Sequence, residues 1–132
     1  GKVRVIDYKT SRDEKVFTTV QSLVDREDKN RKKAVFQVFF YSYLFKQKYT
    51  GDYELIEPGI FNSRDLFSKD FEWKVFDNQQ KTGVSNFDQY ESEFEQVLSE
   101  VLTEMYSAEQ PFDQTTDHKK CGFCPYREIC GR

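Results

Sequence analysis

Residues 34 to 45, AVFQVFFYSYLF, constrain the fold more than any other stretch of this chain. When the segment is wound as a helix, its apolar side chains point in nearly every direction, so the helix must be buried on several sides. The basic run KNRKK leads into it, and Gly51 and Asp52 follow it, so we expect a helix that ends near Lys48. The rest of the chain must supply the surfaces that cover this helix.

Composition excludes several classes of protein. The chain has 132 residues, enough for one domain with a modest core. An aromatic content of 17% with 37% hydrophobic residues argues against disorder. No apolar run is long enough to cross a bilayer, and no signal peptide is visible. We therefore expect a cytoplasmic protein with no membrane partner.

Charge is unevenly distributed along the chain. Residues 1 to 33 hold ten Lys and Arg against six Asp and Glu, whereas residues 34 to 118 hold six against sixteen. Residues 119 to 132 are basic again. Basic ends fit a nucleic-acid partner, while ordinary solvated surface accounts for the acidic middle.

Periodicity predicts the order of the other elements. Residues 3 to 9 alternate as a strand, and residues 53 to 61 and 71 to 76 are further strand candidates. Pro58 and Gly59 indicate an edge strand or a bend in the second of these. Ser85 or Asn86 then caps a long amphipathic helix that extends to about Ser107. The order strand, helix, strand, strand, helix predicts a mixed α/β domain.

Two charged residues end the first strand, VRVIDYK. Asp7 and Lys9 are two residues apart, so they project from one face with their Cα atoms roughly 6 to 7 Å apart. A carboxylate can hold a hard cation such as Mg²⁺, and a neighbouring ammonium can face a phosphate. These are the groups that phosphodiester hydrolysis requires. The alternative is a surface ion pair that contributes little.

The buried helix carries a polar pair, Gln37 and Tyr41, one turn apart on the same face. An amide inside FQVFFY must find hydrogen-bond partners, because leaving it unpaired costs about 1 to 3 kcal/mol. Gln37 therefore points at something polar. Either it is a satisfied core amide, or both residues reach the Asp7 and Lys9 pair.

All three cysteines lie near the end of the chain, as Cys121, Cys124 and Cys130. Clustered thiols in a cytosolic chain favour a metal site over disulfides. An iron–sulfur cluster needs four thiolates, so the fourth would have to come from elsewhere. Alternatively, His118 completes a set of ligands that suits Zn²⁺.

Together these motifs resemble a known family. VRVIDYKT resembles the second catalytic motif of the PD-(D/E)XK nuclease superfamily, and FQVFFY looks like the QxxxY motif of its RecB-like branch. CGFCPYREIC resembles the carboxy-terminal iron–sulfur cysteines of AddB-type helicase–nucleases and of CRISPR-adaptation nucleases. The motifs occur in the family's order and cover almost the whole chain.

The resemblance implies a restriction-endonuclease-like mixed sheet flanked by helices, and it implies roles for named residues. Asp7 and the main-chain carbonyl of Tyr8 would bind the metal, and Lys9 would be the catalytic lysine. Gln37 and Tyr41 would support the site and contact DNA. Three ligands of a 4Fe–4S cluster would be Cys121, Cys124 and Cys130.

The function implied is that of a DNA exonuclease dependent on Mg²⁺ or Mn²⁺. By resemblance it would be a hydrolase of a RecB/AddB-like helicase–nuclease in DNA recombination and repair. Its partners would be DNA and a helicase subunit or a helicase domain of the same parent. Residues 1–118 would form a partial nuclease core, and residues 119–132 a tail with part of the iron–sulfur motif.

Three features of the family pattern are missing from this chain. The family places another metal-binding acid in a preceding hairpin and often a histidine in an earlier helix, and its first cysteine lies further upstream. We therefore expect a carboxy-terminal fragment, truncated at its N-terminal side, inactive or nearly so, and with an incomplete cluster. Two alternatives remain: a catalytically dead version of the fold that binds DNA or acts as a scaffold, and an unrelated zinc-binding interaction domain.

Overall fold

The computed structural model describes residues 1–28 and 30–131 as a mixed α/β protein. Lys29, from the basic run KNRKK, and Arg132, from the predicted tail, lie outside the described residues. The chain groups into two compact units, Gly1–Leu102 and Thr103–Arg132. The division at residue 118 that the sequence suggests stays a prediction.

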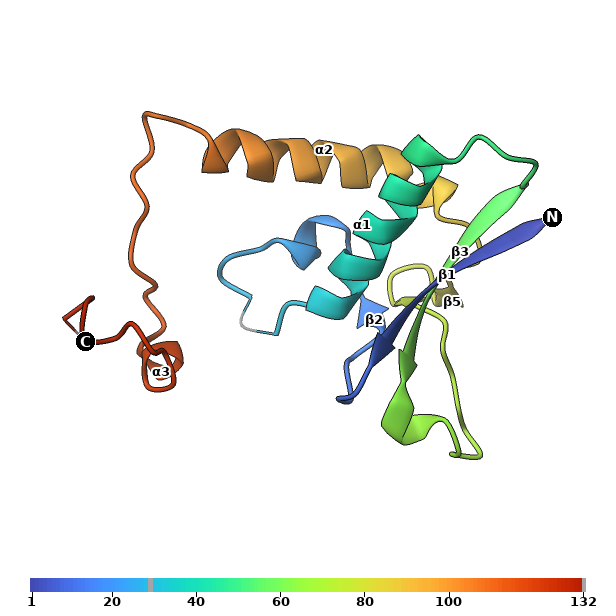
Figure 1. The fold of residues 1–132 in the computed structure, drawn as a ribbon, viewed down its shortest axis with the longest axis horizontal. Coiled ribbons are helices and arrows are strands. Elements are labelled where there is room, and N and C mark those ends of the chain that lie inside the picture. Colours follow the sequence, from blue (N-terminus) through green and yellow to red (C-terminus); the bar gives the residue numbers. More distant parts are fainter. Residues whose placement is uncertain (29, 132) are drawn as a thin grey trace. The chain divides into compact units, whose positions relative to one another are not determined.

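A strand–helix–strand unit forms the centre of the first compact unit. Strand β1 (Lys2–Lys9) pairs in parallel with β3 (Leu55–Asn62), with Lys2 opposite Leu55 and Lys9 opposite Asn62. Helix α1 (Lys33–Lys48) lies between them in sequence and packs against both strands (Figure 1). Parallel strands need a long crossover connection, and α1 supplies it. The predicted first strand and buried helix are confirmed.

Helix α1 is covered on several sides, as its sequence requires. Val35, Val38 and Phe39 are completely buried. The Phe39 ring makes edge-to-face contacts with Phe17 and Phe87, at centroid distances of 5.3 and 5.5 Å. Full burial of each such side chain contributes about 1.5 to 3 kcal/mol, so α1 is a substantial source of core stability.

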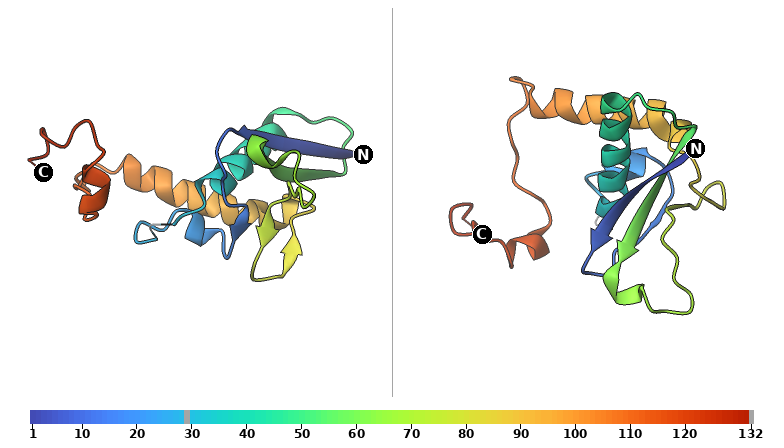
Figure 2. Two further views of the ribbon diagram at one scale, coloured as in Figure 1. Left: turned by 90° about the horizontal axis from the view of Figure 1, so that it is seen from below. Right: turned by 45° about the vertical axis from the view of Figure 1, so that its right-hand side comes forward.

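Figure 2 shows the other elements from two further directions. A small sheet has the order β2-β4-β5, with the first pair parallel and the second antiparallel. The bounds are β2 (Val16–Phe17), the 3-10 turns η1 (Gln21–Leu23) and η2 (Ser63–Asp65), β4 (Phe76–Asp77), β5 (Thr82–Gly83), α2 (Asp88–Met105) and α3 (His118–Cys121). No helix in the described part of the chain is both long and apolar enough to cross a lipid bilayer.

The strand predicted for residues 71 to 76 is mostly wrong. Only Phe76 belongs to a strand, and Lys74 forms an isolated bridge to Gly59. The side chain of Glu72 accepts hydrogen bonds from the backbone amides of Trp73 and Lys74. These two amides are therefore not available for hydrogen bonds to a neighbouring strand.

Pro58 does not interrupt β3, because its missing N–H belongs on the side away from β1. The amide of Ile60, two residues on, donates to the carbonyl of Trp73 at 2.8 Å rather than to β1. Backbone directions alternate along a strand, so Pro58 faces that same side. Proline is tolerated there because no ladder hydrogen bond is lost.

Lys46 links the two long helices of the first unit. Its ammonium donates to Asp88 Oδ1 at 2.6 Å and to Glu91 Oε2 at 2.5 Å. The Lys46 ammonium lowers the pKa of the Asp88 carboxyl, and hydrogen bonds to both carboxylates raise the pKa of Lys46. The network fixes the last turns of α1 against the start of α2.

Gly59 is the position in β3 where a side chain cannot fit. A Cβ atom there would lie 2.4 Å from Trp73 Cε3 and 2.8 Å from Ile6 Cδ1. These contacts are far shorter than van der Waals distance, so the indole packs directly on the strand backbone.

We predict that Gly59→Ala lowers the free energy of unfolding by about 1 to 3 kcal/mol, the usual cost of overpacking a core. Gly51→Ala is the matched control, because nothing lies within 4 Å of a Cβ atom at Gly51. Urea unfolding of both variants measures the difference. Equal stability of the two variants would contradict the close packing of Trp73 on β3.

Candidate active site

Asp7 and Lys9 lie at the end of β1, on the face that α1 covers. Val3, Val5, Asp7 and Lys9 are half-buried, whereas Arg4 and Tyr8 on the other face are exposed. The predicted alternation of faces is therefore confirmed. Only 12% of the Asp7 side chain and 21% of the Lys9 side chain are exposed. Two charged groups are thus held at the edge of the core.

The Asp7 carboxylate and the Lys9 ammonium form an ion pair. Lys9 Nζ lies 2.9 Å from Asp7 Oδ2. The two groups are not aligned for a hydrogen bond, and Asp7 Oδ2 is a buried atom without a hydrogen-bond partner. A buried carboxylate oxygen in this state is costly unless another group satisfies it. Asp7 therefore keeps lone pairs available for a cation.

Gln37 connects this pair to Tyr41. Its Oε1 accepts a hydrogen bond from Lys9 Nζ at 2.5 Å, and its Nε2 donates to the Tyr41 hydroxyl at 2.5 Å. Both residues lie on α1, one turn apart. The amide is thus a polar partner for the site rather than a satisfied core group. The four side chains form one chain of contacts that runs from the strand to the helix.

The side chain of Tyr8 lies away from the candidate site, so only its main chain could contribute to the site. Its side chain is 71% exposed and packs edge-on against Phe61, with ring centroids 5.3 Å apart. Both rings lie on the face of the β1–β3 pair opposite to Asp7. The side chain of Tyr8 therefore does not reach Asp7 and Lys9, and metal binding by its carbonyl stays a prediction.

Asn62 is a supporting residue that sequence reasoning missed. It is 3% exposed and lies opposite Lys9 in the strand register. Its side chain donates to the carbonyl of Asp13 at 3.0 Å and accepts from the amide of Asp13 at 3.2 Å. These bonds hold the loop that follows Lys9. A single asparagine at the end of a strand gives no signal of this role in the sequence.

Similarity to a protein family shows where this chain belongs. The family model of the PD-(D/E)XK nuclease superfamily matches residues 1–131. The chain belongs to this superfamily. No curated protein and no solved structure matches the chain significantly. Its mixed α/β architecture is restriction-endonuclease-like, as the resemblance of its motifs implies.

The site residues fit the divalent metal that nucleases of the PD-(D/E)XK superfamily typically use. Asp7 offers a hard oxygen donor. Its buried Oδ2 accepts no hydrogen bond, and a bound cation would satisfy that oxygen instead. Mg²⁺ is commonly held by one or two carboxylates together with water and phosphate oxygens. Asp7 can therefore be one protein ligand.

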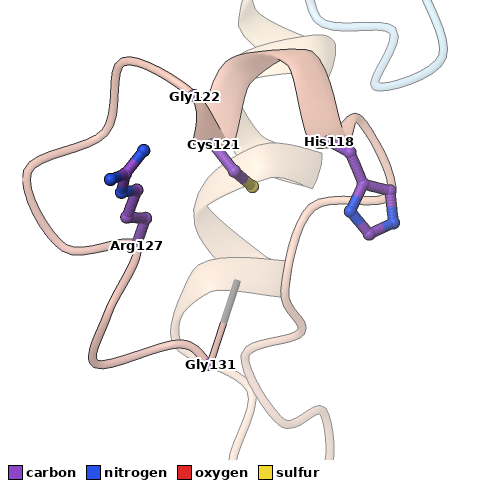
Figure 3. A pocket seen from close by; sticks show the side chains of 5 residues that line it. All are labelled: His118, Cys121, Gly122, Arg127 and Gly131. Carbon is purple, nitrogen blue, oxygen red and sulfur yellow. The ribbon is translucent and has the colours of Figure 1, made fainter.

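The cysteines lie in the second compact unit and do not form a metal site in this structure. Cys121 and Cys124 are half-buried, and Cys130 is exposed. Among the described residues, no three His, Cys, Asp or Glu side chains are arranged to hold a metal. In Figure 3, the Cys121 sulfur points into a small pocket, and the His118 ring is directed away from it. The described residues therefore show no assembled ligand set, and the iron–sulfur cluster and the zinc alternative stay predictions.

We predict that Asp7→Asn abolishes saturable binding of Mn²⁺, because the substitution removes the charged donor while keeping the shape of the side chain. Asp52→Asn, at an exposed position in the turn before β3, is the matched control and should bind Mn²⁺ normally. Electron paramagnetic resonance of free Mn²⁺ measures both. Undiminished binding by the Asp7 variant would exclude Asp7 as a ligand.

Proposed function

We propose that this chain is the nuclease domain of a metal-dependent DNA exonuclease of the RecB/AddB kind, which acts in recombination and repair. One observation carries the proposal: Asp7, Lys9, Gln37 and Tyr41, which come from the two motifs that resemble the family's, are joined by consecutive polar contacts. Membership of the nuclease superfamily supports the reaction class.

The proposed reaction is hydrolysis of a phosphodiester bond. A water oxygen attacks phosphorus and forms a new P–O bond, while the bond from phosphorus to the leaving sugar oxygen breaks. The attacking water loses a proton to solvent, and the leaving oxygen takes one up. Bound at Asp7, a divalent metal would polarise the phosphoryl oxygens and lower the pKa of water.

Lys9 is the residue placed to face the phosphate. Its ammonium is held on one side by Asp7 and on the other by the Gln37 carbonyl oxygen. Two fixed partners position the cation, so little reorganisation is needed as negative charge grows on the phosphoryl oxygens. Replacing a largely buried ion pair by apolar side chains is often neutral or stabilising, so stability does not account for this arrangement.

Gln37 and Tyr41 are proposed as positioning residues with a surface role. Gln37 orients Lys9, and its other end is fixed by the Tyr41 hydroxyl. Because that hydroxyl accepts from Gln37, its own proton remains available to donate to a phosphate oxygen. Tyr41 is 38% exposed, which allows such a contact with DNA.

The cysteine tail belongs to the proposal as part of a 4Fe–4S cluster in the intact protein. The chain has three cysteines, so a cluster with four thiolate ligands needs one more from another segment or chain. A thiolate from elsewhere would also gather Cys121, Cys124 and Cys130, which do not converge here. A helicase subunit or helicase domain as partner, and a cytoplasmic location, follow from the same resemblance.

We predict that Lys9→Ala lowers the rate of cleavage of linear DNA by the intact protein by at least about 100-fold, the usual effect of losing one group that stabilises developing charge. The control is Lys2→Ala, which removes an exposed lysine from the other face of β1. Release of acid-soluble nucleotides with Mg²⁺ measures both variants. Unchanged cleavage by the Lys9 variant would contradict the proposal, and inactive wild-type protein that still binds DNA would favour the catalytically dead alternative.

The metal content of the intact protein, purified without oxygen, tests the tail. We predict iron and sulfide with visible absorption, both lost when Cys121 and Cys124 are replaced by Ser. Retained circular dichroism in the far ultraviolet controls for unfolding. Zinc bound in place of iron would refute the cluster and favour the zinc-binding alternative.

A further inference from the structure

A basic cleft lies between the loop that follows β1 and the residues that lead into α1. It has a volume of about 240 Å³. Four cationic side chains line it, Arg12, Arg31, Lys32 and Lys33, together with two carboxylates, Asp13 and Glu14. The cations come from two segments that are distant in sequence, so the fold brings them together.

Two of the four cations have no carboxylate partner. Arg12 pairs with Asp65 at 3.0 Å, and Lys32 pairs with Glu14. Among the residues that the structure describes, Arg31 and Lys33 form no ion pair. The cleft therefore keeps uncompensated positive charge, which an anion would neutralise.

The position of this charge is unfavourable for the protein alone. The first turn of α1 contains no acidic residue, and no side chain caps it, although Lys32 and Lys33 lie there. Cations near a helix N-terminus oppose the helix dipole, and this costs free energy. A bound anion would reverse this cost, because it interacts favourably with the cations and with the dipole.

The walls of the cleft are held in place. The two hydrogen bonds between the Asn62 side chain and the backbone of Asp13 fix the loop after β1, and Asp65 pairs with Arg12. The other wall is the start of α1, whose next turn is buried in the core at Val35 and Val38. The cations are thus presented by a rigid frame, which limits the entropy cost of binding.

The cleft and the candidate active site are built from neighbouring segments of the chain. Lys33 precedes Gln37 by four residues on α1, and Arg12 follows Lys9 by three residues. One helical turn rises about 5.4 Å, and one strand of duplex DNA advances about 3.4 Å per nucleotide. A strand with its scissile phosphate at Lys9 would therefore bring a phosphate one or two nucleotides away to Arg31 and Lys33.

We propose that this cleft binds a phosphate of the substrate strand, one or two nucleotides from the bond that is cut. The inference rests on the proposed nuclease function and adds a subsite to it. The same chemistry suits an internal phosphodiester or a terminal 5′-phosphate, and the position next to the cleavage site allows either.

The test compares two double variants that lose the same charge. Arg31→Gln with Lys33→Gln changes the cleft, and Lys48→Gln with Lys69→Gln changes exposed lysines elsewhere. Fluorescence anisotropy without divalent metal, so that nothing is cleaved, measures binding to a blunt linear DNA duplex. The duplex carries either 5′-phosphate or 5′-hydroxyl ends, and circular dichroism confirms that both variants are folded.

We expect the cleft variant to bind about tenfold more weakly or worse, since charged hydrogen bonds are lost. The slope of log K against log salt should fall by about one to two. The control should change less than the cleft variant in both respects. A loss that is equal for the two kinds of end identifies an internal phosphate, and a loss confined to 5′-phosphate ends identifies a terminal phosphate.

Equal weakening in the two double variants would overturn the subsite, because the effect would then be one of net charge alone. Unchanged binding by the cleft variant would also overturn it. If Lys9→Ala still abolishes cleavage in that case, the proposed nuclease function stands without the subsite. If the unaltered protein binds neither duplex, both proposals fail.

Discussion

The burial of α1 is the constraint on which the rest of the structure depends. Val35, Val38 and Phe39 leave no surface in contact with water, so strands β1 and β3 and the aromatic residues of α2 must gather around them. This packing fixes the rotation of the helix about its axis. Once the rotation is fixed, the direction of the Gln37 side chain is also fixed. Its amide oxygen accepts a hydrogen bond from Lys9 at the end of β1. The site is a consequence of how the core is filled.

Stability alone does not account for the polar chain from Asp7 to Tyr41. An apolar pair at these positions would pack against the core without the cost of partly burying charges. Instead, a buried oxygen of Asp7 lacks a hydrogen bond, and the Lys9 ammonium contacts both Asp7 and Gln37. Two local rules are therefore broken: a buried oxygen of Asp7 lacks a hydrogen bond, and the N-terminus of α1 lacks a side-chain cap. Such violations tend to occur where a protein binds something.

The cysteine tail shows a different relation between sequence and structure. Its spacing suggests a metal, yet the thiols of Cys121, Cys124 and Cys130 do not converge in the second compact unit. A tail with exposed Phe123 and Ile129 has little core to shape it. Where packing does not dictate a conformation, the ligands themselves must gather the chain, because metal binding and folding are coupled. The proposed cluster would therefore shape the tail, whereas packing around α1 shapes the first compact unit.

The sequence by itself determined the buried helix, the first strand, and the sharing of one face by Asp7 and Lys9, because these follow from local periodicity. It also located Gln37 and Tyr41 one turn apart. It failed for residues 71 to 75, where Glu72 pairs with nearby amides and replaces the expected strand. Only the tertiary structure decided that Gln37 reaches Lys9, that Asn62 holds the loop after β1, and that Arg12 and Arg31 share a cleft. These contacts join residues that are distant in sequence. The local pattern of apolar and polar residues does not say which distant surfaces will pack together.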